Sequence, residues 1–145
     1  MGSTSSETCS RSRTSCEKAG TRTPFFYDTY AVLAYLSGNK RYARYFEKET
    51  GHLTVLNLME TYYAVLRDHG EVAAEKAYSA TAKYAVEFRD EDVKDGMKKR
   101  LALRKKRLDL SYADALGYAV SLRLRLKFLT GDEAFKDLEN VEFVK

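Results

Sequence analysis

The sequence contains little cysteine and little histidine. Its only cysteines, Cys9 and Cys16, lie near the amino end, so we expect a fold without disulfides. A zinc site needs several Cys or His ligands at close spacing, and His52 and His69 lie too far from the cysteines to complete one. A disulfide scaffold and a structural zinc protein are therefore excluded.

Long hydrophobic runs and prolines are also missing. Apolar stretches such as 31–36 are far shorter than the ~20 residues that cross a bilayer, so we expect no membrane span. Residues 1–24 lack the apolar segment of a secretory signal, and we expect a cytoplasmic protein. With 44% apolar and 32% charged residues and one proline, the 145 residues suit a single globular domain.

The first 23 residues differ in composition from the rest. They are rich in Ser and Thr and nearly devoid of apolar side chains, which cannot offset the entropy of ordering a backbone. We expect residues 1–23 to form a flexible tail and residues 24–145 to form the domain.

From Pro24 onward, strand and helix patterns alternate, which predicts an α/β domain with a mainly parallel sheet and helices on both faces. The expected strands are 25–27, 52–56, 84–88, 127–130 and 141–144. The expected helices are 31–36, a second ending at Gly51, one opened by Asn57, 71–82, 92–107, one opened by Ser111, and a short one from Glu133.

Four acidic residues lie at predicted helix starts, three of them just after a predicted strand: Asp28, Glu60, Asp114 and Asp132. Singly, each is explained by capping of free N–H groups at a helix start. Asn57 and Ser111 would each open a capping box, with Glu60 and Asp114 as its third residue. Asp28 and Asp132 could each be the cap itself.

Together, the four acids suggest a site, because helix starts in a parallel α/β sheet lie along its carboxyl edge, where ligands bind. Gathered carboxylates repel one another and raise each other's pKa, unless a cation neutralises them. All-oxygen ligands favour Mg²⁺ or Mn²⁺. With no evident His base or Ser or Cys nucleophile, metal-assisted attack of water on a phosphodiester is the simplest chemistry.

Four tracts carry a family resemblance that runs from Phe25 to Val144. FFYDTYAVLAYL, LNLMETYYAVL, LSYADALGYAVS and FLTGDEAF resemble, in order and spacing, the motifs of PIN-domain ribonucleases, in particular the VapC toxins of toxin–antitoxin pairs. The resemblance implies a three-layer PIN-like α/β/α sandwich and an endoribonuclease dependent on Mg²⁺ or Mn²⁺. It also implies a homodimer and a VapB-like antitoxin that blocks the active site.

Matched residue by residue, the resemblance gives the metal and catalytic roles to Asp28, Glu60, Asp114 and Asp132. Thr29 follows the first acid, and Ser111 and Thr130 carry hydroxyls that could orient a ligand carboxylate. Helix capping or strand packing explains Ser111 and Thr130 equally well.

Residues 94–107 hold eight basic side chains and one acid, a pattern suited to a phosphate backbone or simply to a solvated helix. Beside a phosphodiesterase site we favour RNA binding, by Lys98, Lys99, Arg100, Arg104 and Lys105. Arg123, Arg125 and Lys127 either extend this basic track or decorate the end of their helix. Tyrosines are frequent on the first three helices, a region where the resemblance places the antitoxin.

The sequence therefore predicts a metal-dependent endoribonuclease, most simply the toxin of a type II pair. Two alternatives stay open at this point. One is a PIN nuclease of RNA processing or quality control without an antitoxin. The other is a non-catalytic RNA- or protein-binding module in which the acids are only helix caps.

Overall fold

The computed structural model describes residues 24–145. The segment 1–23, predicted to be a flexible tail, lies outside the described residues, and so do both cysteines. In the part described, no helix is both long enough and apolar enough to span a membrane.

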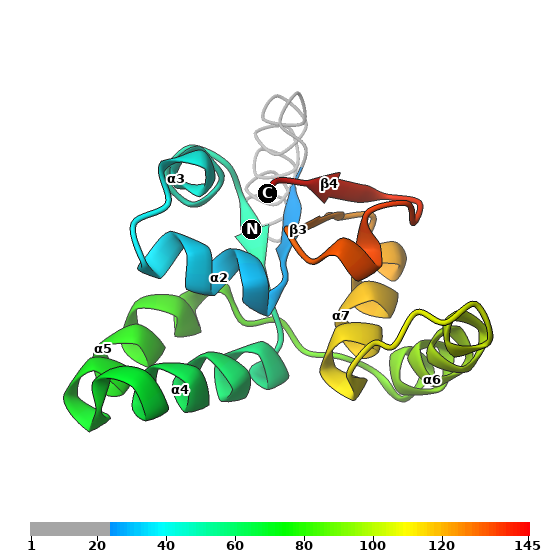
Figure 1. The fold of residues 1–145 in the computed structure, drawn as a ribbon, viewed down its shortest axis with the longest axis horizontal. Coiled ribbons are helices and arrows are strands. Elements are labelled where there is room, and N and C mark those ends of the chain that lie inside the picture. Colours follow the sequence, from blue (N-terminus) through cyan, green and yellow to red (C-terminus); the bar gives the residue numbers. More distant parts are fainter. Residues whose placement is uncertain (1–23) are drawn as a thin grey trace, which may run out of the picture.

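Four short strands form one parallel sheet in the order β2-β1-β3-β4. Three of them match the expected positions: β1 (Phe25–Tyr27), β3 (Lys127–Thr130) and β4 (Val141–Phe143). The register pairs Phe26 of β1 with Phe128 of β3, at the centre of the sheet (Figure 1). The predicted parallel α/β arrangement is confirmed.

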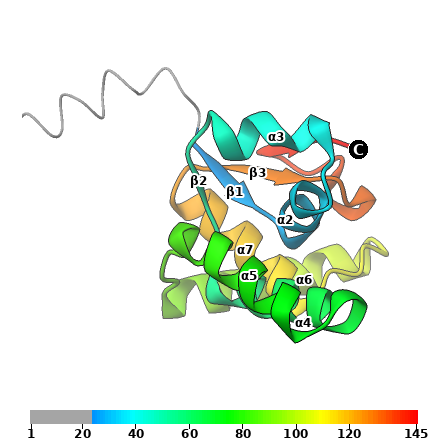
Figure 2. The same cartoon turned by 90° about the vertical axis from the view of Figure 1, so that its left-hand side faces the viewer.

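Six α-helices and two short 3₁₀ helices surround the sheet in the described part of the chain. They are α2 (Thr29–Leu36), α3 (Lys40–Glu47), α4 (Val55–His69), α5 (Glu71–Thr81), α6 (Asp90–Lys105), α7 (Tyr112–Arg123), η2 (Ala82–Tyr84) and η3 (Glu133–Phe135). Helices α2 and α3 lie on one side of the sheet and α7 on the other, while α4 and α5 form a pair beside α2 (Figures 1 and 2).

Two separate cores lie on the two faces of the sheet, because successive strand residues point in opposite directions. Phe25, Tyr27 and Leu129 pack with residues of α2, α3 and α4. Phe26 and Phe128 stack on each other at 5.6 Å and pack with α7 and η3 on the opposite face. The predicted three-layer sandwich is thus confirmed.

The region around β2 differs from the prediction. The strand expected over 52–56 is only β2 (Gly51–His52), and α4 begins already at Val55. Thr54 is the cap, and the buried Asn57 closes the capping box, so the prediction that Asn57 opens the helix was wrong. Glu60 consequently lies in the second turn of α4 rather than at its start.

The expected strand over 84–88 is also absent as a strand. Residues 82–84 form η2, and only Ala85 makes a single parallel bridge, with Leu53. By contrast, the capping box at Ser111 and Asp114 is present, and α7 starts where predicted.

Candidate active site

Asp28 directly follows β1, in the middle of the sheet's carboxyl edge. Its side chain makes no capping bond to α2, although the residue occupies the cap position. Instead, Oδ2 accepts a 2.7 Å hydrogen bond from the Thr130 hydroxyl, and Oδ1 is buried without a partner among residues 24–145. The residue is only 2% exposed and makes no capping bond, so helix capping does not explain why a carboxylate is buried at this position.

The loop after β3 brings Asp132 to the same edge. The Thr130 hydroxyl, which donates to Asp28, accepts a 3.0 Å bond from the backbone N–H of Asp132. One Asp132 oxygen, Oδ1, caps η3 by accepting from the N–H of Ala134. Thr130 therefore joins the Asp28 carboxylate to the backbone of Asp132, and the orienting role of its hydroxyl stays a prediction.

Glu60 reaches the edge from α4 and is held by Thr29. The Thr29 hydroxyl donates a 2.6 Å hydrogen bond to Oε1 of Glu60 and accepts from Nδ2 of Asn57 at 3.1 Å. Asn57 in turn accepts from the backbone N–H and hydroxyl of Thr54. Asn57 thus helps to position Glu60 through Thr29. The sequence indicates a helix cap at Asn57 and gives no sign of this contact.

Asp114 enters from the first turn of α7. Its Oδ2 accepts from the N–H of Ser111 at 3.0 Å, and the Ser111 hydroxyl accepts from the N–H of Asp114 at 3.0 Å. This reciprocal pair fixes the position of the carboxylate on the helix. Ser111 therefore caps α7, which was one of the two roles expected for its hydroxyl.

The four acids influence one another electrostatically. Burial is the largest cause that raises the pKa of Asp28, and the charges of Asp114 and Asp132 raise it further, whereas the hydrogen bond from Thr130 lowers it. Burial also raises the pKa of Asp114, with a further contribution from Asp132. The pKa of Glu60 is raised by burial and by Asp114. These mutual effects indicate that the four acids, far apart in the sequence, lie near one another, and their role as one site stays a prediction.

The donor set fits a hard divalent cation. Asp28 offers a buried oxygen with no partner, and its neighbours are carboxylates whose charges a cation would compensate. Among the described residues, however, no three acidic, His or Cys side chains already form a ligand cluster. The hydrogen bonds from Thr29, Ser111 and Ala134 hold the other three acids in their present positions. Mg²⁺ is usually bound by one or two carboxylates and keeps several waters, so not all four acids need to be direct ligands.

Asp28→Asn should stabilise the metal-free protein at neutral pH. A carboxyl whose folded pKa is raised binds a proton more tightly when folded, so stability falls as pH rises from about 4 toward the raised pKa. The variant lacks this loss, so thermal unfolding in EDTA at pH 7.5 should occur at a higher temperature, by roughly 4 °C for each kcal/mol recovered, and the two curves should converge near pH 4. A variant that is less stable across this range would contradict the raised pKa of Asp28.

The predicted RNA-binding side chains on α6 are not equivalent. Lys98, Arg104 and Lys105 are exposed, and Lys99 is half-buried. Arg100 is held within the chain, where its Nε donates to the carbonyl of Leu110 at 2.9 Å. Arg123, proposed as a possible extension of the basic track, instead makes two hydrogen bonds to the buried Asp92.

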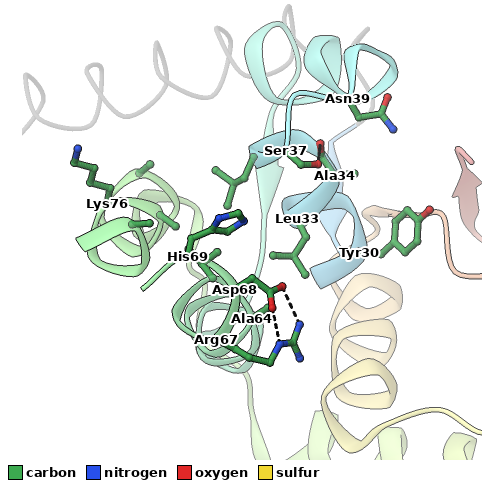
Figure 3. Close-up of a pocket in the computed structure, with 15 residues that line it drawn as sticks. Tyr30, Leu33, Ala34, Ser37, Asn39, Ala64, Arg67, Asp68, His69 and Lys76 are labelled. Carbon is green, nitrogen blue, oxygen red and sulfur yellow. Dashed lines mark hydrogen bonds and ion pairs between the residues drawn. The ribbon is translucent and has the colours of Figure 1, made fainter. Parts of the chain in front are cut away.

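A groove of about 970 Å³ lies between α2 and the α4–α5 pair (Figure 3). Aliphatic side chains line it from all three helices, and Arg67 and Asp68 form an ion pair at 2.8 Å on its rim. Tyr30, the neighbour of Thr29, lies at one end of the lining. The groove residues include Leu33, Ala34, Ala64, Val65, Ala73, Ala77 and Ala80.

Comparisons with solved structures show the same fold in toxin–antitoxin proteins. A toxin–antitoxin complex from Klebsiella pneumoniae is 17% identical with a TM-score of 0.64, covering 81% of this chain and 95% of that one. VapBC2 from Rickettsia felis, solved on a DNA fragment of its promoter, gives 15% and 0.67, with coverages of 83% and 97%. VapC20 of Mycobacterium tuberculosis, a sarcin–ricin loop cleaving toxin, gives 20% and 0.65, with 83% and 96%.

A sequence search among curated proteins gave no match. The family described as PIN domain, however, matches residues 25–141, which contain β1, β2, β3, the six described α-helices and all four acids. The chain therefore belongs to the PIN-domain family.

Proposed function

We propose that this protein is a metal-dependent endoribonuclease that hydrolyses RNA phosphodiester bonds in the cytoplasm, as the toxin of a type II toxin–antitoxin pair. The observation that carries the proposal is the Asp28 carboxylate, which is buried at the carboxyl edge with one oxygen unpartnered among the described residues and two further aspartates nearby. A buried carboxylate with a purely structural role would have partners for both oxygens, whereas Oδ1 of Asp28 has none among the described residues and can bind a cation.

Asp28, Glu60, Asp114 and Asp132 would hold Mg²⁺ or Mn²⁺. Such an ion supplies a compensating charge for the phosphodiester and makes water a stronger nucleophile at neutral pH. Thr130 orients Asp28, and Thr29 orients Glu60, through the hydrogen bonds described above. Neither His52 nor His69 makes a described contact with these acids, so the protein side of the reaction depends on carboxylates.

The basic helix α6 supports RNA as the substrate. Its carboxyl-terminal half carries exposed cations next to the start of α7, which holds Asp114. A phosphate backbone binds such a surface without sequence readout and releases counterions, so binding should weaken with salt. We propose Lys98, Arg104 and Lys105, with Lys99 beside them, as phosphate contacts.

The groove supports a small protein partner, which we propose to be a VapB-like antitoxin. Its aliphatic floor suits the apolar face of a helix, and its charged rim suits polar side chains. Helix α2 contributes both to the groove and, through Thr29, to the active site. A segment bound in the groove would therefore lie beside the carboxylates and could block them.

An exposed apolar stripe on α4 supports association with a second copy. Val55, Met59, Tyr63 and Leu66 follow one another at helical spacing and are 39–62% exposed. Clustered apolar exposure of this kind is typical of a protein interface. We propose a homodimer that covers this stripe.

A cleavage assay on total RNA tests the proposed activity. With Mn²⁺ present we expect cleavage, which EDTA should abolish and added Mn²⁺ should restore, because the ion is needed for the reaction. Asp114→Asn, which keeps an acceptor for the Ser111 N–H, should reduce the rate by about 10²-fold or more.

Full cleavage in EDTA, or by the Asp114→Asn variant, would contradict the proposal. No cleavage by the wild-type protein, together with salt-dependent RNA binding, would favour the non-catalytic binding module instead. Folding of the variant is checked by circular dichroism.

A further inference from the structure

We infer that Arg100 is a positioning residue, which acts by fixing the first turn of α7 and with it Asp114. The catalytic importance of this position depends on the nuclease function proposed above. Arg100 lies among the basic residues of α6, but its contacts differ from those of its neighbours.

Three contacts hold the Arg100 guanidinium against the segment that leads into α7. Nε donates to the carbonyl of Leu110 at 2.9 Å, Nη2 lies 3.9 Å from Asp109, and Cζ lies 4.3 Å from the centre of the Tyr112 ring. The side chain is 22% exposed. Arg44 of α3 offers a comparison outside the proposed site, since its Cζ lies 4.1 Å from the centre of the Tyr45 ring and its side chain is 56% exposed.

The segment that Arg100 contacts surrounds the cap of α7. Leu110 is buried in the core, and Ser111, which follows it, exchanges hydrogen bonds with Asp114. Holding the Leu110 carbonyl and the Tyr112 ring therefore restrains the capping residue from both sides. Any displacement of Ser111 would move Asp114 as well.

Helix α6 can serve as a rigid support because it packs closely on the same turn of α7. A Cβ atom at Gly96 would lie 3.1 Å from the carbonyl oxygen of Ala115, so only glycine fits without adjustment. Gly96 precedes Arg100 by one helical turn, on the same face of α6. The two residues thus join α6 to the start of α7 at adjacent points.

Lysine distinguishes the positioning role from a phosphate contact. Lysine keeps the positive charge, but its ammonium group lacks both the planar shape and the Nε–H of a guanidinium. It therefore cannot make the same contacts with the Leu110 carbonyl and the Tyr112 ring. A phosphate contact should therefore tolerate Arg100→Lys, whereas the positioning role should not. Arg44→Lys, which also replaces an arginine that lies over a tyrosine ring, is the matched control.

The test compares wild type, Arg100→Lys and Arg44→Lys by steady-state cleavage of one RNA over a range of salt concentrations. We expect Arg100→Lys to lower kcat by about 10-fold or more, since small displacements of reacting groups are costly, with KM and its salt dependence unchanged. Arg44→Lys, a change of the same kind outside the proposed site, should change neither. An unchanged kcat in Arg100→Lys would overturn the inference.

Amide hydrogen exchange in the metal-free proteins separates this inference from the proposed nuclease function. In Arg100→Lys, the amides of residues 111–115 should exchange faster than in wild type and in Arg44→Lys. Equal protection in the three proteins would overturn the positioning role even if wild type cleaves RNA. Faster exchange would support it even if no cleavage is found.

Discussion

Replacing Asp28 by asparagine should lower the rate of RNA cleavage by about 10³-fold while leaving the protein folded. Asparagine has nearly the same shape, and its amide oxygen can still accept the hydrogen bond from Thr130. It removes the negative charge from a residue that is only 2% exposed, so no water or neighbouring group at the same position replaces the lost anion. The measurement is the rate of cleavage of a defined RNA at saturating Mn²⁺.

Two controls make the Asp28→Asn result specific. Asp137→Asn, at an exposed aspartate beyond η3, changes the net charge equally and should retain full activity. Mn²⁺ titration by calorimetry should show weaker binding to Asp28→Asn than to wild type. Activity of Asp28→Asn within tenfold of wild type would remove Asp28 from the catalytic site.

Much of the sheet could be predicted because its strands carry local signals. The run Phe25–Tyr27 is apolar and aromatic throughout, as expected for a strand that is buried on both faces. The Ser111–Asp114 capping box marked the start of α7 correctly. Both signals lie within a few neighbouring residues, so they can be recognised without knowledge of the rest of the fold.

The start of α4 could not be predicted in the same way. Val55 and Leu56 suggested a strand, and the box from Thr54 ends in Asn57 rather than the usual Glu or Gln. Asn57 carries that role because its amide also donates to Thr29, which comes from another part of the chain. The sequence contains no local signal for that contact.

The sequence indicated candidate site residues but not the contacts that they make. Position after strands and at helix starts indicated the acids, because parallel strands bring such positions to one edge. It could not show that Asp28 makes no capping bond, that Thr130 joins it to Asp132, or that Arg100 is held by Leu110. These contacts connect residues on different elements.

Arg123→Ala should destabilise the protein by about 3 to 5 kcal/mol, the usual cost of leaving a buried carboxylate without its partner. Arg123 donates to Asp92 through Nε at 2.7 Å and Nη2 at 2.8 Å, and the Asp92 side chain is only 2% exposed. This pair joins the start of α6 to the end of α7. The measurement is the free energy of unfolding from urea denaturation.

The pH dependence and a double variant identify the cause of that loss. Hydrogen bonds from Arg123 hold the pKa of Asp92 below its ordinary value, so this contribution to stability is present above about pH 4 and is lost as pH falls through the lowered pKa. The penalty of Arg123→Ala should therefore shrink in acid.

Adding Asp92→Asn should recover part of the stability, because a neutral amide needs no counter-charge and can still accept from the Arg89 N–H. Arg125→Gln, at an exposed position, should have little effect, and an equal loss there would mean that general charge rather than the buried pair stabilises the helices.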